Sequence, residues 1–132
     1  MIKKFYMKRL EEKVQYYASI YHFDMSPDGK TSYNNEGDAF KHCMSQAELT
    51  YWFGDKIAKF IGDLQEKNNL ANNKAKETMD KWNNEQGRLI VKEVGKQTLK
   101  SLNKQGKMYD KIAEEIMKKM REDKLITNPE EV

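Results

Sequence analysis

Glu36–Cys43 reads EGDAFKHC, and this stretch begins an apolar-periodic run that follows a polar segment. The run predicts a helix over residues 37–53, ended by Gly54. Asp38 and His42 are four residues apart, so their side chains share one face of that helix. A carboxylate beside an imidazole can orient the ring, hold a metal ion or raise the basicity of the imidazole. This stretch therefore predicts one wall of a polar site.

The length and composition favour a helical fold. The chain has 132 residues, the size of one domain with one core. Hydrophobic residues make up 38% and charged residues 34%, with only two prolines and seven glycines. This composition is typical of amphipathic helices with solvated outer faces. We predict an all-α bundle of about five helices in one domain over residues 1–132, with a core at about 34–125 and the N-terminal helix packed on it.

Apolar spacings of three and four residues place these helices along the chain. The predicted ranges are 2–22, 37–53, 55–69, 74–94 and 107–122. A turn is expected at Ser26–Gly29, where proline presets φ and glycine accepts a positive φ. Gly95 and the stretch Ser101–Gly106 are expected to separate the last helix from the one before it.

Two of the predicted helices carry clear apolar stripes, which predict the sides that face the core. The core side of the third helix is expected to comprise Ile57, Phe60, Ile61 and Leu64. The core side of the last helix is expected to comprise Met108, Ile112, Ile116 and Met120, which are spaced by four.

Two later stretches are expected to complete the polar site. In Gly62–Glu66, the carboxylates of Asp63 and Glu66 are three residues apart and can point the same way. In Asp80–Arg88, polar residues recur at spacings of three and four. Asparagines inside a helix compete for backbone hydrogen bonds, so the pair Asn83-Asn84 goes against local propensity, as residues at sites often do.

These stretches carry a resemblance to a family. Gly37–Cys43 resembles the GDAFRH motif of a group of small bacterial helical domains of uncharacterised function. Met79–Arg88 resembles their MDxxNNxxGR motif, and Gly62–Glu66 resembles a GDAHE-like segment between the two. Lys41 stands where arginine is usual, and Gln65 stands where histidine is frequent, which weakens soft-metal binding by that segment. Many members lie at the C-terminal ends of secreted or polymorphic-toxin proteins, so the resemblance implies a toxin-like or effector-like context without a known reaction.

The candidate residues suit a hydrolase. His42 is the expected general base or a metal ligand held by Asp38, with Glu66 as a further catalytic carboxylate. Asp63 and Asp80 are the expected metal ligands, and one histidine among many oxygens favours Mg²⁺, Mn²⁺ or Ca²⁺ over structural zinc. In a metal-free variant, Glu66 or Asp63 is an acid of raised pKa opposite another carboxylate, which suits a glycan bond.

The remaining candidates are assigned to substrate binding. Asn83 and Asn84 are expected to fix the geometry of a substrate, and Arg88 to bind an anionic group through two hydrogen bonds. The site is expected where the start of the second helix meets the middles of the third and fourth.

Other readings stay open. The polar groups can instead tie the helices together in a non-catalytic module that binds a protein partner. The net charge of +3 comes from 24 basic and 21 acidic residues that are interspersed, which disfavours nucleic acid as a partner. The expected partner is a bacterial target molecule or a protein, and the oligomeric state is open.

The sequence also indicates a location. Charged residues interrupt the basic start before any apolar signal region, and no segment predicts a membrane span. Cys43 is the single cysteine, which suits a reducing compartment, and a core position is expected for it. We expect a protein that is cytoplasmic as made and, if exported, delivered by a route that needs no cleaved signal peptide.

Overall fold

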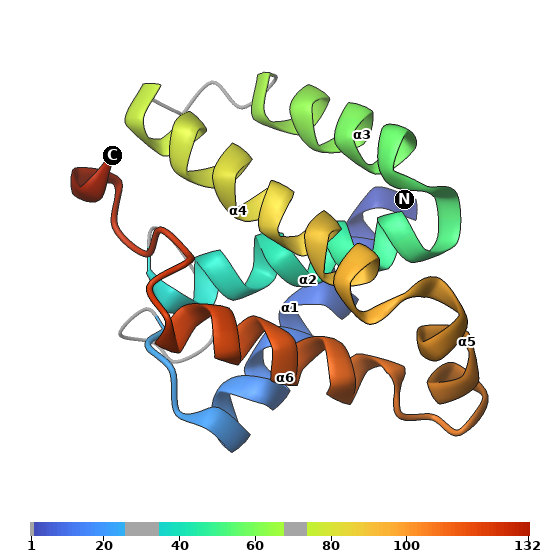
Figure 1. Cartoon of the computed structure of the whole chain (residues 1–132). Coiled ribbons are helices and arrows are strands. Elements are labelled where there is room, and N and C mark those ends of the chain that lie inside the picture. The colour runs from blue at the N-terminus through green and yellow to red at the C-terminus, as the bar shows by residue number, and fades with distance from the viewer. Residues whose placement is uncertain (1, 26–34, 68–73) are drawn as a thin grey trace.

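The computed structural model describes residues 2–25, 35–67 and 74–132. These ranges form α-helices and one short 3-10 helix, and they contain no strand, so the all-α prediction is confirmed (Figure 1). The elements are α1 (Ile2–Tyr21), α2 (Glu36–Phe53), α3 (Asp55–Lys67), α4 (Lys74–Val94), α5 (Lys96–Lys104), α6 (Met108–Arg121) and η1 (Pro129–Glu131). The predicted turn at Ser26–Gly29 and the predicted end of the third helix at Asn69 lie outside the described residues.

The described ranges hold six α-helices where about five were predicted, because residues 95–106 contain α5 instead of a simple connection. Gly95 has a φ of +96°, a conformation that glycine adopts without steric cost, and it ends α4. The helix restarts at once, since the Leu99 amide donates a hydrogen bond to the Gly95 carbonyl at 3.0 Å. Leu99 is fully buried, so α5 is held by packing. None of the described helices combines the length and apolarity needed to cross a bilayer.

Helix α2 is the centre of the bundle. It contacts α1, α3, α4 and α6. Figure 1 shows α3 and α4 side by side against one side of α2, with α6 on the other. The start of α2 is fixed by Asn35, whose side-chain oxygen accepts a hydrogen bond from the Asp38 amide at 2.9 Å. Gly54 ends the helix, as predicted.

The apolar core lies where α1, α2 and α6 meet, with contributions from α4 and α5. Its largest side chains that are fully buried include Phe40, Met44, Ile112 and Ile116. All four members of the predicted stripe on α6 are buried, so that prediction is confirmed.

The predicted core side of α3 is wrong. Ile57, Phe60 and Leu64 are exposed, Phe60 by 67%, and Ile61 is only half-buried. Helix α3 instead packs through a narrow face on which Ala58 and Gly62 are buried. Small side chains let α3 approach α2 and α4 closely, and its large apolar side chains are left on the outside.

Candidate functional site

A row of polar side chains runs through the interface of α2, α3 and α4, and we call it the polar seam. Its members recur every four residues along α2 and α4, which puts each set on one helix face. They are Asp38, His42 and Gln46 of α2, Glu66 of α3, and Lys76, Asp80, Asn84 and Arg88 of α4. All of them except His42 are buried. Buried groups of this kind are costly unless they are paired, so their pairings define the site.

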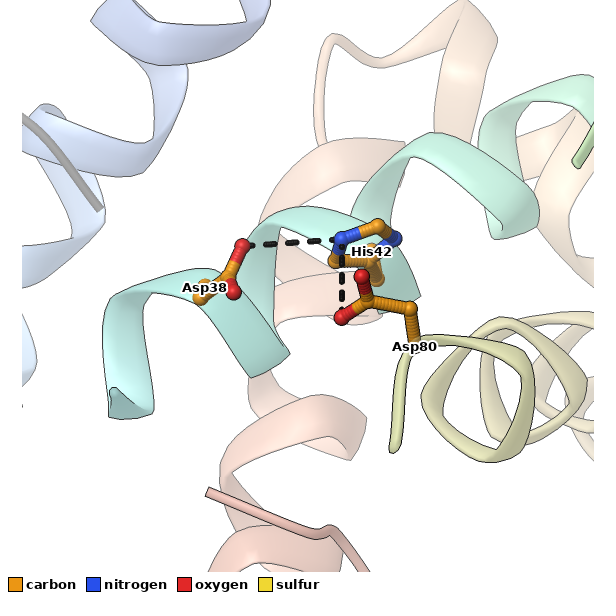
Figure 2. Close-up of side chains that lie close together, drawn as sticks. All are labelled: Asp38, His42 and Asp80. Atoms are coloured by element: carbon orange, nitrogen blue, oxygen red, sulfur yellow. Dashed lines mark ion pairs between the residues drawn. The ribbon is translucent and has the colours of Figure 1, made fainter. Parts of the chain in front are cut away.

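His42 is at the centre of the seam, with its side chain 17% exposed. Its Nε2 atom lies 3.5 Å from Asp38 Oδ1 and 3.3 Å from Asp80 Oδ1 (Figure 2). Its Nδ1 atom lies 2.9 Å from Asn84 Oδ1 and 3.6 Å from Glu66 Oε1. Side chains from three helices therefore hold the ring on both edges.

Lys76 is a member of the seam that the sequence reasoning missed. Its ammonium lies 3.3 Å from Asp38 Oδ2 and 2.9 Å from Asp80 Oδ2, so it bridges the two carboxylates. The signal was present in the sequence, because Lys76 lies four residues before Asp80 and must share its helix face. Removing one partner of a buried ion pair typically costs about 3–5 kcal/mol, so this bridge ties α2 to α4.

The pairings shift the pKa values of the seam. Burial by itself lowers the pKa of His42, but the contact with Asp38 and the charges of Asp80, Asp38 and Glu66 raise it above its ordinary value. Burial by itself raises the pKa of Asp38, but His42, Lys41 and Lys76 hold it well below its usual range. Both shifts favour the charged forms of the two groups.

The pKa of Lys76 follows the same pattern. Burial by itself lowers it, but the charge of Asp38 and the hydrogen bond to Asp80 raise it above the usual value. The ammonium that bridges the two carboxylates is therefore charged.

The seam includes four of the predicted site residues in contact with His42. They are Asp38, Glu66, Asp80 and Asn84. Asp63, a predicted metal ligand, is on another side of α3. Its carboxylate is 41% exposed and pairs with Lys59 at 2.6 Å. Asp63 and Glu66 are three residues apart on α3, so their side chains point in different directions. The Glu66 carboxylate lies in the polar seam, and the Asp63 carboxylate lies outside it.

Asn83 and Arg88, predicted to bind substrate, have partners within the chain. The Asn83 side chain donates a hydrogen bond to the Ile126 carbonyl at 2.7 Å and accepts one from the Ile126 amide at 2.9 Å. It therefore holds the segment after α6 against α4. Arg88 Nη1 donates to Gln46 Oε1 at 2.9 Å, and Arg88 Nε lies 3.6 Å from Asp55 Oδ1. Arg88 thus extends the seam away from His42.

Gly87 sets the distance between α2 and α4. A Cβ atom at this position would lie 2.3 Å from the Cys43 carbonyl oxygen, so only glycine allows the two backbones to come this close. Cys43 itself is fully buried, and burial raises the pKa of its thiol to about 12. Its Sγ donates a hydrogen bond to the Asn83 carbonyl. A core role is thus confirmed for Cys43.

Three surface clefts were located on the described part of the chain, and none is lined by a residue of the polar seam. One of the three, with a volume of about 660 Å³, is lined by α1 residues such as Arg9 and Tyr16 together with Tyr109 of α6.

Comparison with known protein families gives a match over most of the chain. A family described as a domain of unknown function, DUF6973, matches residues 12–124. Neither the curated proteins nor the solved structures gave a match. The matched range contains all residues of the polar seam.

Proposed function

For this chain, which belongs to the DUF6973 family, we propose a hydrolase-like effector function directed at a bacterial target, with His42 at the reactive centre. The observation that carries the proposal is the convergence of one imidazole and two buried carboxylates from two helices on a partly exposed position. Hydrolysis needs groups that activate water and move protons, and imidazole with carboxylates is a common set for this purpose.

The proposed roles follow from the contacts. His42 is the group that meets water or substrate, because it alone in the seam reaches solvent appreciably. Asp38 and Asp80 face its Nε2 atom, and Asn84 and Glu66 face Nδ1. Asp38, Asn84 and Glu66 are positioning residues in this scheme, since they act through the ring. A divalent cation is a second means of activating water at such a centre, because a bound metal lowers the pKa of a water ligand.

Growth of bacteria that express the chain tests this proposal. The chain would be expressed in the cytoplasm and, separately, with an added export signal, beside His42→Ala at matched soluble level. The matched control is His22→Ala, which removes the other histidine of the chain at an exposed position. We expect growth inhibition in one compartment that is lost with His42→Ala and kept with His22→Ala. The compartment would assign the substrate to cytosolic or envelope material.

Two results would contradict the proposal. One is no inhibition in either compartment. The other is equal inhibition by the wild-type chain and by His42→Ala, provided that both are folded by circular dichroism.

A second candidate, a protein-interaction module, is favoured by the outer face of α3. The exposed apolar side chains there are those of Ile57, Phe60 and Leu64, and Phe53 at the end of α2 is exposed as well. Contiguous exposed apolar surface commonly marks a protein contact. Inhibition that survives His42→Ala and is lost with Phe60→Ser would favour this candidate over the hydrolase.

A further inference from the structure

We propose that Asp38 Oδ1, His42 Nε2 and Asp80 Oδ1 bind one divalent cation of the Zn²⁺ or Mn²⁺ type. The binding of the ion is independent of the proposed hydrolase function. Only the role of the ion in activating water rests on that function. Figure 2 shows both carboxylates next to the same ring nitrogen, with Asp38 of α2 on the left and Asp80 of α4 below. The ligand set differs from the predicted pair of Asp63 and Asp80, since Asp63 lies elsewhere on α3.

The separations of the donor atoms fit one ion. His42 Nε2 lies 3.5 Å from Asp38 Oδ1 and 3.3 Å from Asp80 Oδ1, and ligand atoms of all three residues lie within 4.8 Å of one another. Bonds of about 2.1 Å at a tetrahedral angle place two donors about 3.4 Å apart. The two distances from His42 Nε2 to the carboxylate oxygens are therefore those expected between ligands of one ion.

The second observation concerns Asp80 Oδ1 alone. This atom is buried and accepts no hydrogen bond from any group in the described ranges. The side chain is only 1% exposed. A buried carboxylate oxygen without a donor is costly, and most such groups in proteins have a partner. This oxygen makes an ion-pair contact with His42 Nε2 at 3.3 Å but no hydrogen bond, and it faces the side of the ring where the ion would lie.

The groups behind the three donors match the outer contacts of known metal sites. A metal-binding histidine usually gives its other ring N–H to an oxygen acceptor, which leaves the remaining nitrogen free for the metal. Asn84 Oδ1, 2.9 Å from Nδ1, supplies that acceptor. The ion would take the place of the proton that Nε2 carries in the charged form of the ring, and that proton would be released to solvent. Lys76 binds Oδ2 of both aspartates, so it orients the carboxylates and leaves both Oδ1 atoms toward the ring.

Lys41 is a cation that lies near a proposed ligand oxygen, 3.4 Å from Asp38 Oδ1. It also lies 3.4 Å from Glu11 Oε1, and its side chain is 16% exposed, so it has a second partner to turn toward. One imidazole with two carboxylates suits Zn²⁺ and Mn²⁺ better than Mg²⁺ or Ca²⁺, which prefer oxygen ligands throughout.

Calorimetric titration of the purified full chain with Zn²⁺ and Mn²⁺ tests the site. We expect one ion per chain, and at least a tenfold loss of affinity in Asp80→Asn and in His42→Gln. The matched control is Asp63→Asn, which removes a carboxylate of α3 outside the site and should leave the affinity unchanged. No binding by the wild-type chain, or equal losses in Asp63→Asn and Asp80→Asn, would overturn the proposal.

A second measurement needs no variant and holds even if the seam variants do not fold. The chain has two histidines, so His22 is an internal reference for His42 in nitrogen NMR spectra of the ring. The first equivalent of Zn²⁺ should shift Nε2 of His42 and leave His22 unchanged. A shift at His22 alone, at Nδ1 of His42 in place of Nε2, or at neither ring would contradict the site.

The experiments can reject the hydrolase function and the metal site independently of each other. Binding of one ion without growth inhibition would keep the metal site and reject the hydrolase. Inhibition that depends on His42, in a chain that binds no ion, would keep the hydrolase and reject the metal site.

Discussion

Helices α3 and α6 are both amphipathic, but α6 buries its apolar face and α3 exposes its large apolar side chains. Helix α6 turns its apolar stripe inward, and Ile112 and Ile116 are fully buried. Helix α3 turns its apolar stripe outward, and Ile57 and Phe60 are at least half exposed. An apolar stripe thus predicts that a helix is amphipathic. It does not by itself predict which face is buried against the other helices.

The cause lies in what each helix packs against. Helix α6 meets the apolar core of α1 and α2, where large apolar side chains are removed from water. Helix α3 meets the polar seam, where Glu66 is paired and Gly62 leaves space for other side chains. A Cβ atom on Gly62 would lie 2.8 Å from the Gln46 amide nitrogen. Helix α3 therefore packs on α2 and α4 through the small residues Ala58 and Gly62, and its large apolar side chains stay exposed.

The largest expected effect is in the apolar core. Ile116→Ala should lower the free energy of unfolding by about 2–5 kcal/mol, because it leaves a cavity in a fully buried position. Chemical denaturation followed by circular dichroism would measure it. A loss below about 1 kcal/mol would mean that α6 is not packed as described.

The next effect concerns the close approach of helices at the seam. Gly87→Ala should cost about 1–3 kcal/mol, since the new methyl group would meet the backbone of Cys43. Gly62→Ala should cost less, because its neighbours are side-chain ends of Gln46 and Asn84, which can move more easily than a backbone. Equal losses in the two variants, measured by denaturation, would contradict the described contrast between a backbone contact and a side-chain contact.

The smallest effect is expected on the outer face of α3. Phe60→Ser should change the free energy of unfolding by no more than about 0.5 kcal/mol, because its side chain is 67% exposed. The same denaturation experiment, run beside Ile116→Ala, measures the difference between the two helices. A loss above about 1 kcal/mol would show that α3 buries its apolar stripe after all, against a second copy or within the chain.

Much of the candidate site could be predicted from residue spacing. The four-residue steps from Asp38 to His42 and from Asp80 to Asn84 each predicted a shared helix face, and the structure brings these two pairs together. Spacing could not choose between Asp63 and Glu66, because a step of three residues turns the side chain part of the way around the helix. It also could not show that Asn83 faces the segment after α6, since that contact joins residues far apart in the chain.

The amino-acid sequence by itself determined where most helices run and which residues share a face. Helix hydrogen bonds and side-chain directions are local, so the pattern of a short segment is enough to predict them. The tertiary structure alone decided that α3 turns its apolar stripe outward, that Lys76 bridges Asp38 and Asp80, and that α5 packs as a separate helix. These outcomes depend on contacts between helices, where the fit of small side chains and the pairing of buried charges outweigh the preference of one stripe for burial.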